Sequence, residues 1–82
     1  MALEPYRRSR GLSQADVAEQ LGLSSAGYVS RLERGSTPFP VRLALLVEAW
    51  SDGEVRAVDL LPPEDAQLLS QVISRASAPP AD

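Results

Sequence analysis

The fold of this chain is decided by residues 10–35, which read RGLSQADVAEQLGLSSAGYVSRLERG. Three of its four glycines divide this stretch: Gly11, Gly22 and Gly35. Glycine often follows the last residue of a helix because it adopts the left-handed backbone conformation without strain. The stretch therefore predicts two short helices, one that ends at Gly22 and one that ends at Gly35.

The first of these two helices has a clear start signal. Ser13 is suited to cap the free N–H groups of a helix, and Asp16, three residues later, completes a weaker form of the capping box. Val17 and Leu21 then fall on one face, with polar residues on the other. The sequence from Ser13 to Gly22 therefore predicts an amphipathic helix of about two turns.

The next helix starts almost at once. Ser24 or Ser25 provides another N-cap, and the helix is predicted to run from there to Arg34. The link between the two helices, from Gly22 to Ser24, is about three residues long. Two short helices joined by a tight turn that contains glycine form a helix-turn-helix.

The helix that ends at Arg34 is predicted to have two different faces. Val29 and Leu32 point into the core. Tyr28 lies alongside them, where it either fills the edge of the core or hydrogen-bonds a phosphate. The opposite face carries small, polar or basic side chains at helical spacing: Gly27, Ser30, Arg31 and Arg34. Small residues let a helix backbone enter the DNA major groove, and an arginine one turn later reaches guanine O6 and N7, so this helix is predicted to read bases.

Residues around this helix are predicted to contact the DNA backbone. Gln14 lies at a helix N-terminus, where N–H groups and the helix dipole attract a phosphate. The same strand can be flanked by Arg7, Arg8 or Arg10. The predicted DNA-binding residues are Gln14, Ser24, Ser25, Ala26, Gly27, Tyr28, Ser30, Arg31 and Arg34, together with Arg8. The two arginines of the helix also suit a solvated surface, and the dipole alone can explain Arg34; Arg31 is the better candidate for a base contact.

Further helices are predicted on both sides. A short first helix begins at Leu3 or Pro5 and ends before Gly11. A fourth helix begins at Pro40 and runs to Trp50. This helix is apolar on most of its circumference, which predicts that it lies at the centre of the core.

The C-terminal part is predicted to end in a longer helix. Residues 54–57 are interpreted as a short extended piece, followed by one helical turn over residues 58–61. The last helix begins at Pro63, and its apolar stripe consists of Leu68, Leu69, Val72, Ile73 and Ala76. This stripe either folds back on the same core or pairs with a second copy of the chain.

These elements predict an all-α protein, a compact bundle of four to five short helices with a C-terminal amphipathic helix. Residues 1–61 are assigned to a helix-turn-helix DNA-binding domain. Residues 62–76 form the C-terminal helix, which is a candidate dimerisation element, and residues 77–82 are predicted to be a disordered tail.

Composition excludes several classes of function. The chain has no cysteine and no histidine, which removes disulfides, thiolate nucleophiles, imidazole bases and almost every structural zinc site. We therefore expect no enzyme activity, no metal and no cofactor. No segment approaches the roughly 20 apolar residues of a membrane span, and the N-terminus does not resemble a signal peptide. The expected location is the cytoplasm, without a membrane partner.

Charge is distributed unevenly along the chain. The formal net charge is −3. Up to Arg42, six arginines and four acidic residues give +2, whereas from Leu43 onward two arginines and seven acidic residues give −5. This asymmetry leaves the arginine face as the side that attracts DNA. The acidic half could equally dock a basic protein, such as a toxin or another regulator.

Two runs of the sequence resemble a known family. Residues 10–22 and residues 28–35 carry the motifs Leu-Ser-Gln, Leu-Gly and Val-Ser-Arg-Leu-Glu-Arg-Gly, and they closely resemble the lambda-repressor-like, or Cro-type (XRE), helix-turn-helix family. The resemblance extends over residues 3–50 and implies a bundle of four or five helices. More loosely, residues 38–62 are similar to small prophage Cro-like proteins and to antitoxin-type proteins.

The resemblance also implies roles for individual residues. It implies that Gln14 contacts a phosphate, that the third helix reads bases, and that Arg7 pairs with Glu33 beneath the motif. One departure concerns the register. Between Gly22 and Glu33 the chain has one residue more than the usual family spacing, so the resemblance does not fix which of residues 24–28 occupy the base-reading positions.

The sequence as a whole predicts a sequence-specific DNA-binding transcriptional regulator, a Cro-like repressor that inserts the helix over residues 25–34 into the major groove as a homodimer. Its predicted partners are double-stranded DNA and a second copy of the chain. The alternative is an antitoxin-like protein-interaction module that binds its partner through the acidic C-terminal half.

Overall fold

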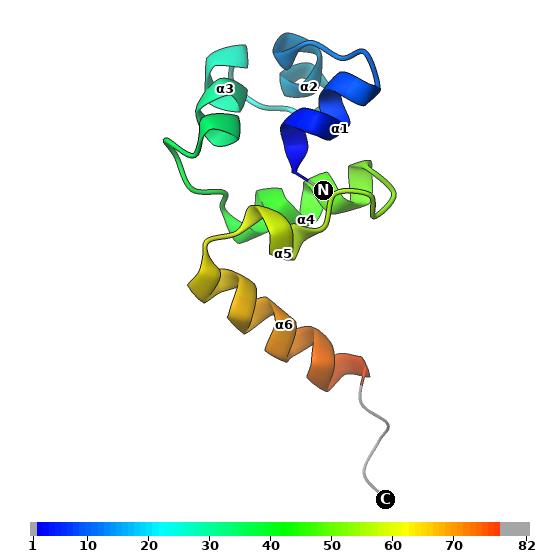
Figure 1. The fold of residues 1–82 in the computed structure, drawn as a ribbon, viewed down its shortest axis with the longest axis vertical. Coiled ribbons are helices and arrows are strands. Elements are labelled where there is room, and N and C mark those ends of the chain that lie inside the picture. Colours follow the sequence, from blue (N-terminus) through cyan, green and yellow to red (C-terminus); the bar gives the residue numbers. More distant parts are fainter. Residues whose placement is uncertain (1, 78–82) are drawn as a thin grey trace, which may run out of the picture.

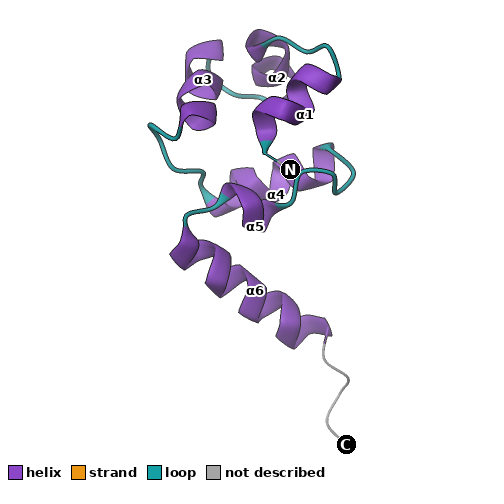
Figure 2. Cartoon of the chain, viewed as in Figure 1, coloured by secondary structure: helices purple, strands orange, loops and turns teal. Residues whose placement is uncertain are grey.

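The computed structural model describes residues 2–77 and has, over that range, six α-helices and no β-strand (Figure 2). The helices are α1 (Leu3–Ser9), α2 (Gln14–Leu21), α3 (Ala26–Arg34), α4 (Val41–Trp50), α5 (Ala57–Leu60) and α6 (Pro63–Ser77). This confirms the predicted class, a bundle of short helices followed by a longer C-terminal one. Of the tail predicted over residues 77–82, Ser77 is the last residue of α6, and residues 78–82 lie outside the described residues.

The ends of α2 are formed as predicted. The Ser13 hydroxyl accepts a hydrogen bond from the Asp16 backbone N–H (3.0 Å), and the Asp16 carboxylate accepts one from the Ser13 N–H (2.9 Å). These bonds complete a capping box and hold the pKa of Asp16 below its ordinary value. At the other end, Gly22 has the left-handed conformation (φ +71°) that ends the helix.

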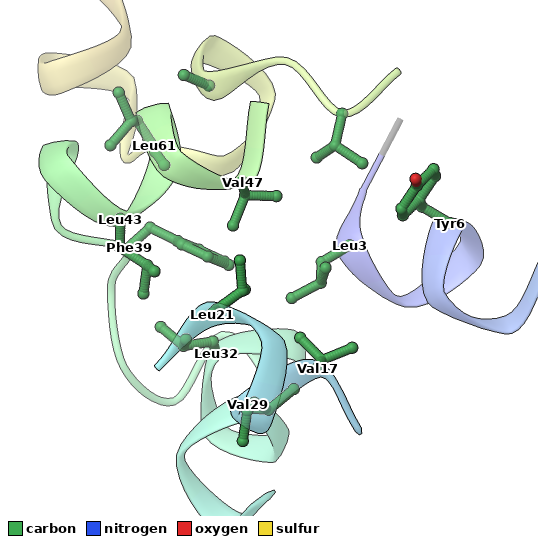
Figure 3. Packing of buried hydrophobic residues seen from close by; sticks show 14 residues of the cluster. Leu3, Tyr6, Val17, Leu21, Val29, Leu32, Phe39, Leu43, Val47 and Leu61 are labelled. Carbon is green, nitrogen blue, oxygen red and sulfur yellow. The ribbon is translucent and has the colours of Figure 1, made fainter. Parts of the chain in front are cut away.

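The core lies where α1 to α4 meet (Figure 1). Side chains from these four helices point toward one another (Figure 3): Leu3, Val17, Leu21, Val29, Leu32, Leu43 and Val47. At the end of α4, Trp50 packs edge-on against Tyr6 of α1, with 5.3 Å between the ring centroids. The Trp50 indole also donates a hydrogen bond to the side-chain oxygen of Gln20 (3.0 Å), which ties α4 to α2.

The prediction that α4 occupies the centre of the core is wrong for one of its sides. Leu43, Ala44 and Val47 are buried, but Leu45 and Leu46 are 43% and 45% exposed. The reason is that α2 packs against one side of α4 and α5 against another, and these short helices cover only part of its circumference. The open side borders a groove of about 580 Å³ whose other wall includes Leu23 and Tyr28.

The connection from α4 to α5 is a compact turn rather than the extended piece expected for residues 54–57. Ser51 is buried, and its hydroxyl accepts a hydrogen bond from the Val55 N–H (2.9 Å). The Glu48 carboxylate accepts one from the Ala57 N–H (2.7 Å). The side chains of Glu48 on α4 and of Ser51, its C-cap residue, thus satisfy backbone groups that would otherwise be buried without partners.

Helix α6 leaves the body of the bundle after α5 and extends away from it (Figure 1). Near its start, Ala66 and Leu69 pack against the core. Leu68, Val72 and Ile73 of its apolar stripe are exposed rather than folded back. Among the described residues, no helix is long and apolar enough to span a membrane.

Candidate nucleic-acid interface

Helices α2 and α3 are joined by a short connection and pack against each other. The Leu23 N–H donates to the Ala18 carbonyl (2.8 Å), which closes the end of α2. The Ser25 hydroxyl then accepts a hydrogen bond from the Tyr28 N–H (3.2 Å) and caps α3. The predicted pair of capped helices is confirmed, with Ser25 as the N-cap and Ala26 as the first residue of α3.

The two faces of α3 are arranged as the sequence predicts. Val29 is 0% exposed and Leu32 is buried, and both point into the core (Figure 3). On the outer face, Gly27, Arg31 and Arg34 are exposed and Ser30 is half-buried. At the N-terminal end, Ser24 and Ser25 are exposed and Ala26 is half-buried. The chain therefore presents a helix face with two arginines and several small residues to solvent.

Tyr28 is half-buried at the edge of the core and also contacts the exposed face. Its ring packs against the buried cluster, and the guanidinium carbon of Arg31 lies 5.9 Å from the ring centroid. This distance permits a cation–π interaction. The long Arg31 side chain is thereby held beside a ring that the core supports.

Gly27 lies in the first turn of α3 without a structural requirement for glycine. Its φ angle is not positive, and a Cβ placed on it would lie 3.6 Å from Arg31 Nη1 and 3.6 Å from Ser25 Oγ, which is ordinary contact. Glycine in a helix is less stable than alanine by up to about 1 kcal/mol. Nothing within the described residues 2–77 explains that loss of stability, whereas close approach of an outside partner would.

One carboxylate links the three N-terminal helices beneath the exposed face. Glu33 of α3 accepts hydrogen bonds from Arg7 Nε (2.7 Å) and Arg7 Nη2 (3.1 Å), so the pair implied by the resemblance is confirmed. Arg7 Nη1 also donates to the Leu12 carbonyl (3.0 Å). Hydrogen bonding to Glu33 raises the pKa of Arg7 above its ordinary value, against the effect of burial.

Gln14 is part of the same network, which the sequence analysis did not predict. Its amide nitrogen donates to Glu33 Oε1 (2.9 Å) from the first turn of α2. An amide nitrogen carries a second N–H, and the side-chain oxygen accepts hydrogen bonds. Glu33 therefore orients Gln14 while leaving further hydrogen-bonding capacity at the start of α2.

The other arginines of the first helix pair with acids of the chain. Arg8 contacts Glu4 of the same helix (2.9 Å), and both side chains are largely exposed. Arg10 contacts Glu54 (2.8 Å) and lies over the Tyr6 ring, 5.2 Å from its centroid. The hydrogen bond that Arg10 donates to the Glu54 carboxylate raises the pKa of Arg10. Exposed pairs of this kind contribute little to stability, so Arg8 can exchange Glu4 for another anion.

A protein-family model described as a helix-turn-helix domain matches residues 1–58, which is more than half of the chain. The chain belongs to the helix-turn-helix domain family. This membership agrees with the resemblance to Cro-type proteins and indicates DNA binding as the function of the domain. The match ends within α5, so α6 lies beyond the part of the helix-turn-helix protein that the family model covers. The comparisons with curated proteins and with solved structures give no match.

Proposed function

We propose that the protein is a sequence-specific transcriptional regulator that inserts α3 into the DNA major groove. The observation that carries this proposal is the division of α3 between a buried side, formed by Val29 and Leu32, and an exposed side that includes Gly27 and Arg31. A helix anchored in this way presents one rigid face to a partner. The width of the major groove admits one such helix.

Arg31 is proposed to read a base. A guanidinium donates two hydrogen bonds to guanine O6 and N7, and no other base edge accepts both. The Tyr28 ring holds the Arg31 side chain near the helix surface, which reduces the entropy lost when the arginine is fixed on a base. Gly27 and the short side chains of residues 24–26 allow the start of α3 to approach the base edges.

Gln14, Arg8 and Arg34 are proposed to contact phosphates. The Gln14 amide, oriented by Glu33, lies at the start of α2, where the free N–H groups of a helix attract an anion. The positive charge of the two arginines attracts phosphates whatever the DNA sequence is. The excess of acidic residues from Leu43 onward disfavours approach of DNA to the C-terminal part of the chain.

The protein is further proposed to act as a dimer and a repressor. One recognition helix reads only a few base pairs, and two copies related by a two-fold axis read both half-sites of a palindrome. A dimer of this size bound at a promoter would block access of other proteins to the same DNA.

Selection of bound duplexes from a random pool tests this function. We expect a consensus with two-fold symmetry and guanine among the specified bases. In titrations of the consensus, the logarithm of the affinity should fall linearly with the logarithm of the salt concentration. Arg56→Ala, which removes an exposed arginine outside α1 to α3, is the matched control and should leave the consensus unchanged. If the selection enriches no sequence, the proposal of sequence-specific DNA binding is wrong. Absence of any binding at low salt would favour the protein-interaction module instead.

A further inference from the structure

Helix α6 carries an apolar stripe that the body of the protein does not cover. Leu68 is 60% exposed, Val72 is 62% exposed and Ile73 is 45% exposed. Of the α6 side chains that the structure describes, Ala66 and Leu69, both near the start of the helix, pack against the core. An isolated helix of this length is marginally stable in water, and most helices gain their stability by burying an apolar face. The stripe therefore needs a partner surface.

The charges at the ends of α6 identify that partner. Glu64 and Arg75 are eleven residues apart, which places them on nearly the same face of the helix, roughly 16 Å apart along its axis. The same geometry puts Leu68 and Val72 between them, within about a quarter turn. Both charged side chains are exposed, and among residues 2–77 no ion pair joins either of them to another side chain.

We propose that a second copy of the chain covers this face, with the two α6 helices antiparallel. In that arrangement Glu64 of each copy lies beside Arg75 of the other, and the two Leu68–Val72 faces meet between these pairs. A parallel pair would instead place glutamate beside glutamate and arginine beside arginine. The charge pattern of α6 is thus complementary to itself only in the antiparallel orientation. The inference deepens the dimer of the proposed function by assigning its interface, and its test needs no DNA.

The molecular mass of the full chain in solution, measured by sedimentation equilibrium over a range of concentrations, tests the interface. We expect a reversible dimer. Replacing Leu68 and Val72 together by glutamine should weaken association about tenfold or more, since it removes both central apolar contacts. The matched control replaces Leu45 and Leu46 by glutamine. These leucines are also exposed but lie on α4, so association should be unchanged. A monomer at all concentrations, or a dimer lost only in the α4 variant, would overturn the proposal.

Exchanging the charges of Glu64 and Arg75 tests whether the two α6 helices are antiparallel. Glu64→Arg alone and Arg75→Glu alone each place two like-charged pairs in the antiparallel dimer, and each should weaken association roughly threefold or more. The double variant restores both pairs and should recover the affinity of the original chain. If the single exchanges leave association unchanged, the helices are not antiparallel. Because Glu64 lies in the first turn of α6 and Arg75 in the last, each exchange also opposes the helix dipole, so circular dichroism of all four proteins is needed to show that association weakens while the helix is kept.

Dimerisation through α6 and sequence-specific binding of DNA through α3 can fail independently of each other. A variant that no longer dimerises should still bind a single half-site, because α3 and its supporting residues are unchanged. A protein that dimerises through α6 but enriches no DNA sequence would refute the proposed function and leave the interface standing.

Discussion

The Arg31 guanidinium lies over the Tyr28 ring, with 5.9 Å between its central carbon and the ring centroid. The two residues are three apart on α3, so their side chains are neighbours on the helix surface. Because the Tyr28 ring also packs against the buried cluster, the position of the exposed arginine depends on the core.

Replacing Arg31 by alanine should weaken binding to the cognate DNA by about 1–3 kcal/mol and relax the preference at one base pair. The reason is the loss of both hydrogen bonds to a guanine edge. Replacing Arg8 by alanine should instead weaken binding to all sequences alike, since a phosphate contact carries no base information. Fluorescence anisotropy with cognate and altered duplexes measures both effects. Unchanged affinity and preference in the Arg31 variant would mean that another face reads the bases.

Replacing Gly27 by alanine should change the stability of the fold and the affinity for DNA in opposite directions. A methyl group fits at this position, so the free energy of unfolding should rise by up to about 1 kcal/mol. Affinity for DNA should nevertheless fall, because the methyl group would hold α3 away from the base edges. Ser70→Ala, an exposed change on α6, serves as the control for DNA affinity. A Gly27 variant that binds as tightly as the original chain would place this residue outside the contact.

Replacing Glu33 by alanine should lower the free energy of unfolding by roughly 3–5 kcal/mol, measured by urea denaturation. The Glu33 side chain is only 3% exposed, and its removal leaves the Arg7 charge without its partner in a buried site. Replacing Arg7 and Glu33 together by leucine should be less damaging, because no unpaired charge remains. Glu54→Ala, which breaks an exposed pair with Arg10, should have little effect. Equal losses in the Glu33 and Glu54 variants would contradict this account.

The capping box of α2 predicts a specific dependence of stability on pH. The Ser13 N–H lowers the pKa of Asp16 in the folded state, so the ionised carboxylate stabilises the fold at pH values above its unfolded pKa of about 3.9. This contribution should be lost as the pH falls through the lower folded pKa. In thermal denaturation, Asp16→Ala should lower Tm at pH 7, and the difference from the original chain should shrink in strong acid. A constant difference at all pH values would rule out the charge as its cause.

The two sides of α4 should differ in their tolerance of substitution. Val47→Ala leaves a cavity in the core and should cost roughly 2 kcal/mol, whereas Leu46→Ala should cost less than about 1 kcal/mol because much of that side chain already contacts water. Urea denaturation of both variants provides the measurement. The reverse order would mean that the open side of α4 is covered in solution.

The features that the sequence predicted correctly are local ones. The Ser13–Asp16 box and the left-handed Gly22 depend on residues within one turn of each other, and helical spacing alone places Val29 inward and Arg31 outward. Such signals do not require knowledge of the neighbouring helices.

The features that the sequence did not predict depend on how helices are placed in space. Gln14 and Glu33 are 19 residues apart, and their hydrogen bond exists only because α2 and α3 pack together. The exposure of Leu45 likewise depends on which sides of α4 its neighbours cover. Apolar composition cannot distinguish a helix with a core on every side from one with an open side.

The hydrogen bonds of Glu33 also bear on how such a protein can diverge. A single substitution at position 7 or 33 passes through a destabilised intermediate, so the two positions are expected to covary among descendants of this chain. Exposed positions such as Arg34 carry no such constraint. The outer face of α3 can therefore change while the frame that holds the helix is inherited unchanged.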